Sequence, residues 1–238
     1  MPKINNLKLG QAPRTVLTVG DKENLKAISH KRADLLELRV DRFEKISPAY
    51  VTRIIRSRRK TGLPLILTIR DKKEGGGRFI SDQAKLKLFN SVVFLVDALD
   101  IELNSAILAR VVKIAHSNKK TVIISYHNLK TTPGIKRLKS IALNAKRQGA
   151  DIIKVAVNAS KVKDVATLLE FTLGHKQKNL VTISLGKTGT ISRLFFPLAG
   201  SLFTYAYLDK PFGSGQLPLA LLQKHLSLYY PAHNKSVS

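Results

Sequence analysis

The sequence alternates short apolar segments, rich in β-branched residues, with amphipathic segments eight times along the chain. Short β-branched runs are typical of buried strands, and apolar residues repeating with a helical period are typical of helices. The predicted strands cover residues 15–19, 35–40, 65–70, 94–102, 121–126, 152–157, 180–185 and 202–208. The predicted helices cover residues 21–30, 47–60, 81–91, 105–118, 133–148, 161–173, 190–196 and 217–228. Eight successive strand–helix units favour a closed (β/α)8 barrel, a TIM barrel, over an open doubly wound sheet.

The chain shows no sign of a boundary between domains. Its 238 residues contain no linker and no break in composition. An α/β barrel of this length is usually one domain. We therefore expect a single barrel domain over residues 1–238, with the polar ends 1–12 and 231–238 irregular.

The predicted sixth strand contains a lysine where a buried strand normally carries an apolar residue. Residues 151–158 read DIIKVAVN, with Lys154 near the centre. Burying an ammonium group is costly, and a lysine in a site with little water loses its proton more readily and becomes an amine nucleophile. The alternative is an edge strand whose lysine side chain extends into solvent. The segment alone does not decide between these interpretations.

Several other predicted strands also end in charged or polar residues. In a TIM barrel the carboxyl ends of all strands meet at one mouth, where active sites lie. Glu37 and Arg39 have the same parity within one strand, as do Asp100 and Glu102 within another, so the side chains of each pair point in one direction. Further polar residues at or just beyond strand ends are Arg70, Glu74, His127 and Arg193. Buried charges require partners, so their convergence at one mouth predicts a functional site.

The residue types at this mouth supply an amine, an imidazole and several cations. Lys154 can attack a ketone to form an imine, which acidifies the neighbouring hydrogens, and His127 can move protons to a leaving hydroxyl. The cations Arg39, Arg70 and Arg193 can hold a carboxylate and hydroxyls, and their like charge disfavours the ammonium form of the lysine. No histidine cluster has metal-ligand spacing. The residues predict a Schiff-base lyase for an anionic keto substrate, without metal or organic cofactor.

Short segments at the predicted strand ends also occur in a characteristic order. They read ELRVD at 37–41, TIR at 68–70, KEGG at 73–76, DIEL at 100–103, SYH at 125–127, KVA at 154–156, ISRL at 191–194 and GQ at 215–216. Together these segments resemble type I 3-dehydroquinate dehydratase. The resemblance implies a hydro-lyase that converts 3-dehydroquinate to 3-dehydroshikimate, in the shikimate pathway of aromatic amino-acid biosynthesis.

The resemblance also implies roles for individual residues. Lys154 corresponds to the Schiff-base lysine and His127 to the general acid/base, with Glu74 as the carboxylate that orients the histidine. The residues that correspond to substrate-binding positions are Glu37, Arg39, Arg70, Arg193 and Gln216. Asp100 and Glu102 correspond to carboxylates that support the arginines. A homodimer, and no cofactor other than the covalent imine, are further implications.

The sequence departs from the family pattern in the loop that closes over the site. Arg193 corresponds to the arginine that binds the substrate carboxylate, and Gln216 to the glutamine of the closing loop. That loop often reads SAPGQ in the family, whereas residues 212–216 here read FGSGQ. Phe212 stands at the position of the substrate-contacting serine, and Ser214 follows two residues later. On the seventh strand, methionines of the family are replaced by Ile183 and Leu185.

Composition bears on the possible partners. The chain has 41 basic and 16 acidic side chains, a net charge of +25, which favours nucleic acid, an anionic membrane or a small anionic substrate. The basic residues are scattered, which fits a lysine-rich surface without a macromolecular partner. With no tryptophan and six scattered tyrosines, few stacking platforms exist, so nucleic-acid binding is less favoured. No apolar run reaches 18 residues, so no membrane partner is expected.

The absence of cysteine excludes disulfides, thiolate metal sites and a cysteine nucleophile, and it fits a reducing compartment. The first nine residues lack the apolar core of a signal peptide, so we expect a cytoplasmic protein.

Within the same fold and chemistry, an aldolase or transaldolase that acts on sugar phosphates is the alternative to the dehydratase.

Overall fold

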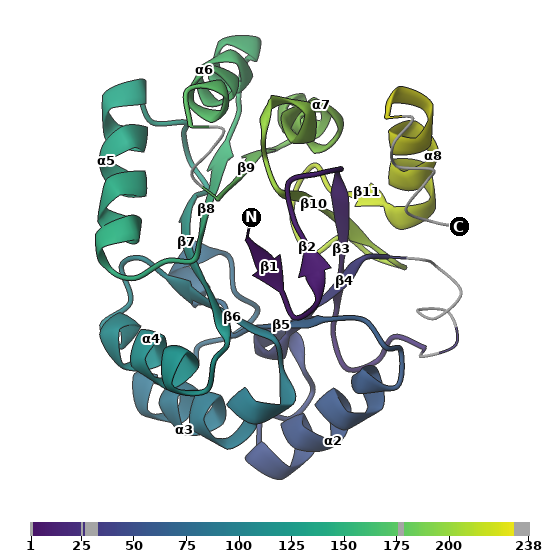
Figure 1. The fold of residues 1–238 in the computed structure, drawn as a ribbon, viewed down its shortest axis with the longest axis vertical. Coiled ribbons are helices and arrows are strands. Elements are labelled where there is room, and N and C mark those ends of the chain that lie inside the picture. The colour runs from purple at the N-terminus through teal and green to yellow at the C-terminus, as the bar shows by residue number, and fades with distance from the viewer. Residues whose placement is uncertain (1, 25, 27–32, 176–178, 231–238) are drawn as a thin grey trace.

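The computed structural model describes residues 2–24, 26, 33–175 and 179–230, and its centre is a ring of eight parallel strands (Figure 1). The ring strands are β3 (Arg14–Val19), β4 (Leu35–Arg39), β5 (Leu65–Thr68), β6 (Ala98–Glu102), β7 (Thr121–Asn128), β8 (Ile152–Asn158), β9 (Leu180–Leu185) and β10 (Phe203–Tyr207). Strand β10 pairs with β3, and each later strand pairs with the next as far as β9. The short strand β11 (Leu217–Pro218) extends the sheet beyond β10. The backbone N–H of Leu202, just before β10, donates to the Leu180 carbonyl in β9 at 2.9 Å, which closes the ring. The predicted barrel is thereby confirmed.

Helices cover the outside of this ring (Figure 1). Within the described residues they are α2 (Pro48–Arg59), α3 (Asp82–Val92), α4 (Leu108–Ser117), α5 (Ile135–Arg147), α6 (Val162–Leu173), α7 (Ser192–Ala199) and α8 (Leu219–Tyr229). Of the predicted helix over 21–30, residues 25 and 27–30 lie outside the described part of the chain, and residues 21–24 are not helical. Ser47 and Ser81 cap α2 and α3, because each hydroxyl accepts the N–H three residues later.

Helix α7 extends beyond residue 196, where the predicted helix ends. The helix continues through Pro197 to Ala199. A proline in this position removes only the hydrogen bond to the carbonyl four residues earlier, in a helix that ends two residues later. Gly200 then ends the helix in the left-handed conformation with φ 110°.

The N-terminal segment is also more ordered than predicted. Residues 3–8, expected to be irregular, form a hairpin of β1 (Lys3–Ile4) and β2 (Leu7–Lys8), and Asn5 adopts φ 54° in its turn. The hairpin lies across the middle of the ring in Figure 1. Ile4 and Leu9 are fully buried against the apolar interior of the barrel, and this burial orders the segment. The predicted irregular tail at 231–238 lies outside the described residues.

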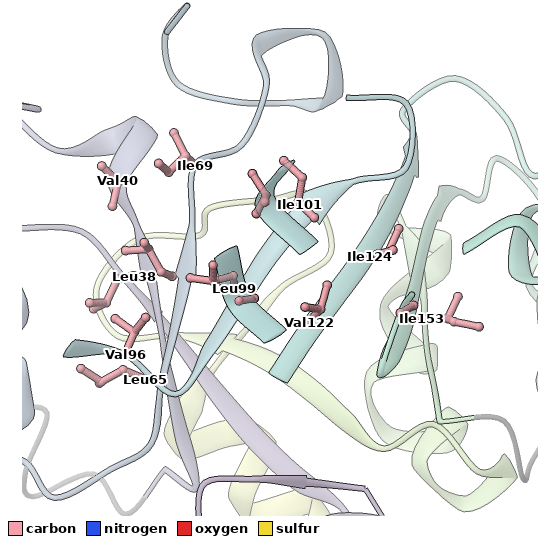
Figure 2. Close-up of a cluster of buried hydrophobic side chains, with 14 of the residues drawn as sticks. Leu38, Val40, Leu65, Ile69, Val96, Leu99, Ile101, Val122, Ile124 and Ile153 are labelled. Carbon is pink, nitrogen blue, oxygen red and sulfur yellow. The ribbon is translucent and has the colours of Figure 1, made fainter. Parts of the chain in front are cut away.

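The hydrophobic core has two layers, set by the alternation of side chains along each strand. Outward residues such as Leu38, Leu99 and Val122 project from the strands in Figure 2 and belong to one buried cluster with residues of the outer helices. Inward residues at the amino ends of the strands, among them Val16 and Phe203, fill the barrel floor beneath the hairpin.

Further along the strands, the inward positions become polar. In β4 they run Leu35, Glu37, Arg39, and in β8 the apolar Ile152 is followed by Lys154. The barrel therefore has an apolar floor and a charged mouth.

Candidate active site

A cavity of about 320 Å³ opens at the carboxyl ends of the strands. All eight residues predicted to be catalytic or substrate-binding line it: Lys154, His127, Glu74, Glu37, Arg39, Arg70, Arg193 and Gln216. The two predicted supporting carboxylates, Asp100 and Glu102, are not among the lining residues. The structure thus brings the eight predicted residues together around one cavity.

Lys154 lies in the middle of the sheet, because β8 pairs with β7 on one side and β9 on the other. It is 4% exposed, so the alternative of an edge-strand lysine extending into solvent is wrong. Its Nζ lies 3.0 Å from Asp100 Oδ2, 3.3 Å from Glu37 Oε1 and 4.3 Å from the ring centre of Tyr205. The expectation of arginines around the amine is wrong at short range, since the direct charged partners are carboxylates.

Those carboxylates belong to a buried network beneath the cavity. Arg70 donates to Asp100 at 2.7 Å, and to Glu102 and Ser125 at 2.8 Å each. Burial alone would raise the pKa of Asp100, but the charges of Arg70 and Lys154 outweigh it and hold that pKa well below its usual value. Asp100 is therefore an ionised anchor shared by the arginine and the lysine.

His127 lies on β7, next to the strand that carries Lys154. Its Nδ1 lies 2.8 Å from Glu74 Oε2, and its backbone N–H donates to the same oxygen at 2.9 Å. Burial, together with the charges of Arg70 and Lys154, lowers the pKa of His127 well below 6.5. The imidazole is therefore neutral at pH 7, and the contact at Nδ1 leaves Nε2 to accept a proton.

Glu74 reaches His127 because hydrogen bonds and close backbone packing fix the loop after β5. The 3-10 helix η2 (Lys72–Glu74) is capped by Asp71, whose carboxylate accepts the Lys73 N–H at 2.8 Å. A Cβ at Gly76 would lie 2.2 Å from the Arg70 carbonyl oxygen, so only glycine fits this close approach. Burial, assisted by the nearby Glu102 and Asp100, raises the pKa of Glu74 to about 7.

Arg39 is held by a carboxylate that the sequence interpretation did not select. Asp41 is fully buried in the 3-10 helix η1 (Val40–Arg42) and accepts two hydrogen bonds of 2.8 Å from Arg39. It also accepts the backbone N–H groups of Arg70 and Gly77 at 3.2 and 2.9 Å. This bidentate pairing fixes the guanidinium at the cavity wall.

The loop after β10 covers part of the mouth. Gln216 Oε1 accepts the backbone N–H groups of Phe212 and Gly213 at 2.7 and 3.2 Å, and its Nε2 donates to Thr18 Oγ1 at 3.2 Å. The ring centre of Phe212 lies 6.0 Å from the Arg39 guanidinium carbon. The departure from serine at this position therefore places an aromatic ring beside a cation in the cavity wall.

Arg193 stands apart from the other arginines of the cavity. It lies in the first turn of α7 and is 3% exposed, yet no acidic partner is found for it within the described residues. Its Nε is buried without a hydrogen-bond partner. Burial lowers the pKa of Arg193 to about 10, so the group still carries its charge at pH 7. A buried cation without a protein partner is suited to bind an anion.

Two further features concern possible ligands and membranes. In the part of the chain that the structure describes, no group of three or more His, Cys, Asp or Glu residues is placed to hold a metal ion. The helices of that part are too short or too polar to cross a membrane.

Comparisons with known proteins agree on one family. The family model for type I 3-dehydroquinase matches residues 18–232. The 3-dehydroquinate dehydratase of Thermodesulfovibrio yellowstonii is 37% identical over 216 residues, covering 89% of this chain and 93% of that protein. The corresponding protein of Methanococcoides burtonii is 34% identical over 233 residues, covering 96% and 99%.

Solved structures of the same family also match this chain. The crystal structure of the 3-dehydroquinate dehydratase of Aquifex aeolicus VF5 matches with a TM-score of 0.81 and 36% identity, covering 91% of this chain and 99% of that one. The type I enzyme of Clostridium difficile, solved with covalently modified comenic acid, matches with a TM-score of 0.89 and 28% identity, covering 98% and 99%.

Proposed function

The chain belongs to the type I 3-dehydroquinase family and is a hydro-lyase, and we propose that it dehydrates 3-dehydroquinate to 3-dehydroshikimate through a Schiff base on Lys154. The activity places the protein in the shikimate pathway of aromatic amino-acid biosynthesis. One observation carries the Schiff-base mechanism: a buried amine lines the same cavity as a neutral imidazole and a buried arginine that has no acidic partner among the described residues.

Substrate binding follows from the charges of the cavity. Arg193 receives the substrate carboxylate, an anion that the described residues do not supply to this guanidinium. Glu37 and Arg39 lie at the wall, where they contact hydroxyls, and Gln216 closes the mouth from its loop. The binding energy at the carboxylate orients the ketone toward Lys154.

The lysine must lose a proton before it attacks the ketone. His127 is the base, because its imidazole is neutral, whereas the low pKa of Asp100 makes that carboxylate a poor proton acceptor. The amine nitrogen then bonds to the carbonyl carbon, and the carbonyl oxygen leaves as water, which gives the protonated imine.

The elimination uses the imine as an electron sink. His127 removes a proton from the carbon next to the imine carbon, and the electron pair forms an enamine. The enamine expels the hydroxyl group on the following carbon, which takes a proton from His127 and leaves as water. Water then adds to the imine and releases the product ketone and the Lys154 amine. One water is consumed and two are released, so the net reaction removes one water without metal or organic cofactor.

The test follows the formation of the conjugated product by its ultraviolet absorbance. The unaltered protein is expected to convert 3-dehydroquinate, Lys154→Ala to lose turnover, and the exposed-site control Lys161→Ala to retain it. No turnover by the folded, unaltered protein would contradict the activity. Turnover by Lys154→Ala at the rate of the control would contradict the role of this lysine.

We also propose that the enzyme acts in the cytoplasm as a homodimer and without a nucleic-acid partner. Large apolar side chains on the adjacent helices α7 and α8 support the dimer, since Phe195, Leu198 and Leu228 are 46%, 58% and 69% exposed. Light scattering is expected to give twice the chain mass of 26.4 kDa, and Leu198→Asp to shift it toward the monomer. A monomer in the unaltered protein would contradict this arrangement.

A further inference from the structure

A second buried polar group in the cavity wall has no hydrogen-bond partner among the described residues. Tyr205 lies on β10, is 3% exposed and lines the cavity. Its hydroxyl is buried and makes no hydrogen bond within the described residues. Among the cavity-lining residues that the structure describes, only Arg193 Nε shares this condition.

Such a hydroxyl is costly, because it loses its hydrogen bonds to water on folding and gains none in return. Most buried polar groups in proteins are paired, so an unpaired one at a cavity is expected where a ligand completes it. A phenylalanine ring would fill the same space without this cost, so the packing of β10 does not require the hydroxyl.

The surroundings of Tyr205 place it at the reacting end of the cavity. The Lys154 ammonium lies 4.3 Å from its ring centre, on the electron-rich face. Burial, with Glu37 and Asp100, raises the pKa of Tyr205 well above 10, against the opposing charges of Arg70 and Arg193. The hydroxyl therefore stays protonated at neutral pH and can donate a hydrogen bond.

We propose that the Tyr205 hydroxyl is a further substrate-binding group of this site, which donates a hydrogen bond to a substrate oxygen. The inference rests on the proposed function, because it assigns one more contact to the same anionic, oxygen-rich substrate. The ring packs against Lys154, and the hydroxyl donates a hydrogen bond to the substrate.

Tyr205→Phe tests this contact, because it removes one oxygen atom and keeps the ring. We expect KM for 3-dehydroquinate to rise about 3- to 12-fold, the effect of one buried hydrogen bond, with kcat changed less than about 2-fold. In the same variant, the Tm of the ligand-free protein is expected not to fall, because the hydroxyl has no partner to lose. Tyr207→Phe, on the same strand but outside the cavity lining, is the matched control and should change neither value.

The outcomes separate this inference from the function on which it rests. Turnover by the unaltered protein with an unchanged KM in Tyr205→Phe would overturn the inference alone. A fall in the Tm of ligand-free Tyr205→Phe, relative to the control, would also overturn it, because the hydroxyl would then have a partner within the protein. No turnover by the unaltered protein would overturn the proposed function, and this contact with it.

Discussion

Replacing Glu74 by glutamine is expected to stabilise the ligand-free protein, and to do so increasingly as the pH rises. Glu74 is buried beside His127, and its side chain is 11% exposed. Its pKa is raised from 4.5 to about 7, chiefly because burial penalises the charged form. Glutamine keeps the shape of the side chain and an oxygen that accepts the His127 N–H groups, but it does not ionise.

The direction in which stability changes with pH follows from proton binding. Between about pH 4.5 and 7 the folded protein keeps the Glu74 proton, whereas the unfolded chain has released it. The free energy of unfolding contributed by Glu74 therefore falls as the pH rises through this window, and it stays low above about 7. Between pH 5 and pH 8 the loss amounts to about 2.5 kcal/mol, or roughly 5–10 °C in Tm for a protein of this size.

The assay is thermal unfolding by circular dichroism at several pH values. The Tm of Glu74→Gln minus that of the unaltered protein is expected to increase from pH 5 to pH 8. The depressed pKa of His127 affects stability in both proteins and largely cancels in the difference. Glu170→Gln, at an exposed position of α6, controls for the loss of one negative charge. A difference that is independent of pH, or that shrinks as the pH rises, would refute the assignment of the raised pKa to Glu74.

Three further substitutions test other parts of the site. Arg193→Gln should raise KM by at least about 10-fold in steady-state kinetics, and an unchanged KM would show that the carboxylate binds elsewhere. Phe212→Ser removes the ring beside Arg39 and should lower kcat/KM about 2- to 5-fold, whereas an equal value would show that this ring–cation contact does not contribute to turnover. Asp100→Asn takes a charged partner from Arg70 and should cost about 3 kcal/mol in urea unfolding; a cost below about 1 kcal/mol would contradict the proposed anchor.

The barrel and the inward strand residues of the cavity could be predicted from the sequence because both depend on local periodicity, whereas Gln216, in a loop, was found only through the family resemblance. The parity of Glu37 with Arg39, and of Asp100 with Glu102, decided which side chains face inward, and the carboxyl ends of parallel strands decided where they meet.

The contacts inside the cavity could not be predicted in the same way. Parity does not give the stagger between strands, and that stagger brings Asp100 and Glu37 to Lys154 where arginines were expected. Asp41 lies in a short 3-10 turn whose position depends on packing against distant segments. Tyr205, like Lys154, has a polar atom at an inward strand position. It was not selected because an aromatic ring at such a position is usual in a hydrophobic core.

The N-terminal hairpin was missed for a related reason. Strands of two residues, such as Lys3–Ile4, have no measurable periodicity. Their order comes from the burial of Ile4 and Leu9 on the barrel floor, which only the closed barrel provides.

The most direct test of the Schiff base is reduction with borohydride during turnover, followed by mass spectrometry. The unaltered protein is expected to gain the mass of one reduced adduct, and peptide mapping is expected to place it on Lys154. Lys154→Ala should gain no adduct, while Lys161→Ala should gain it as the unaltered protein does. An adduct on another lysine, an adduct that persists in Lys154→Ala, or turnover without any trapped adduct would contradict the central role of Lys154.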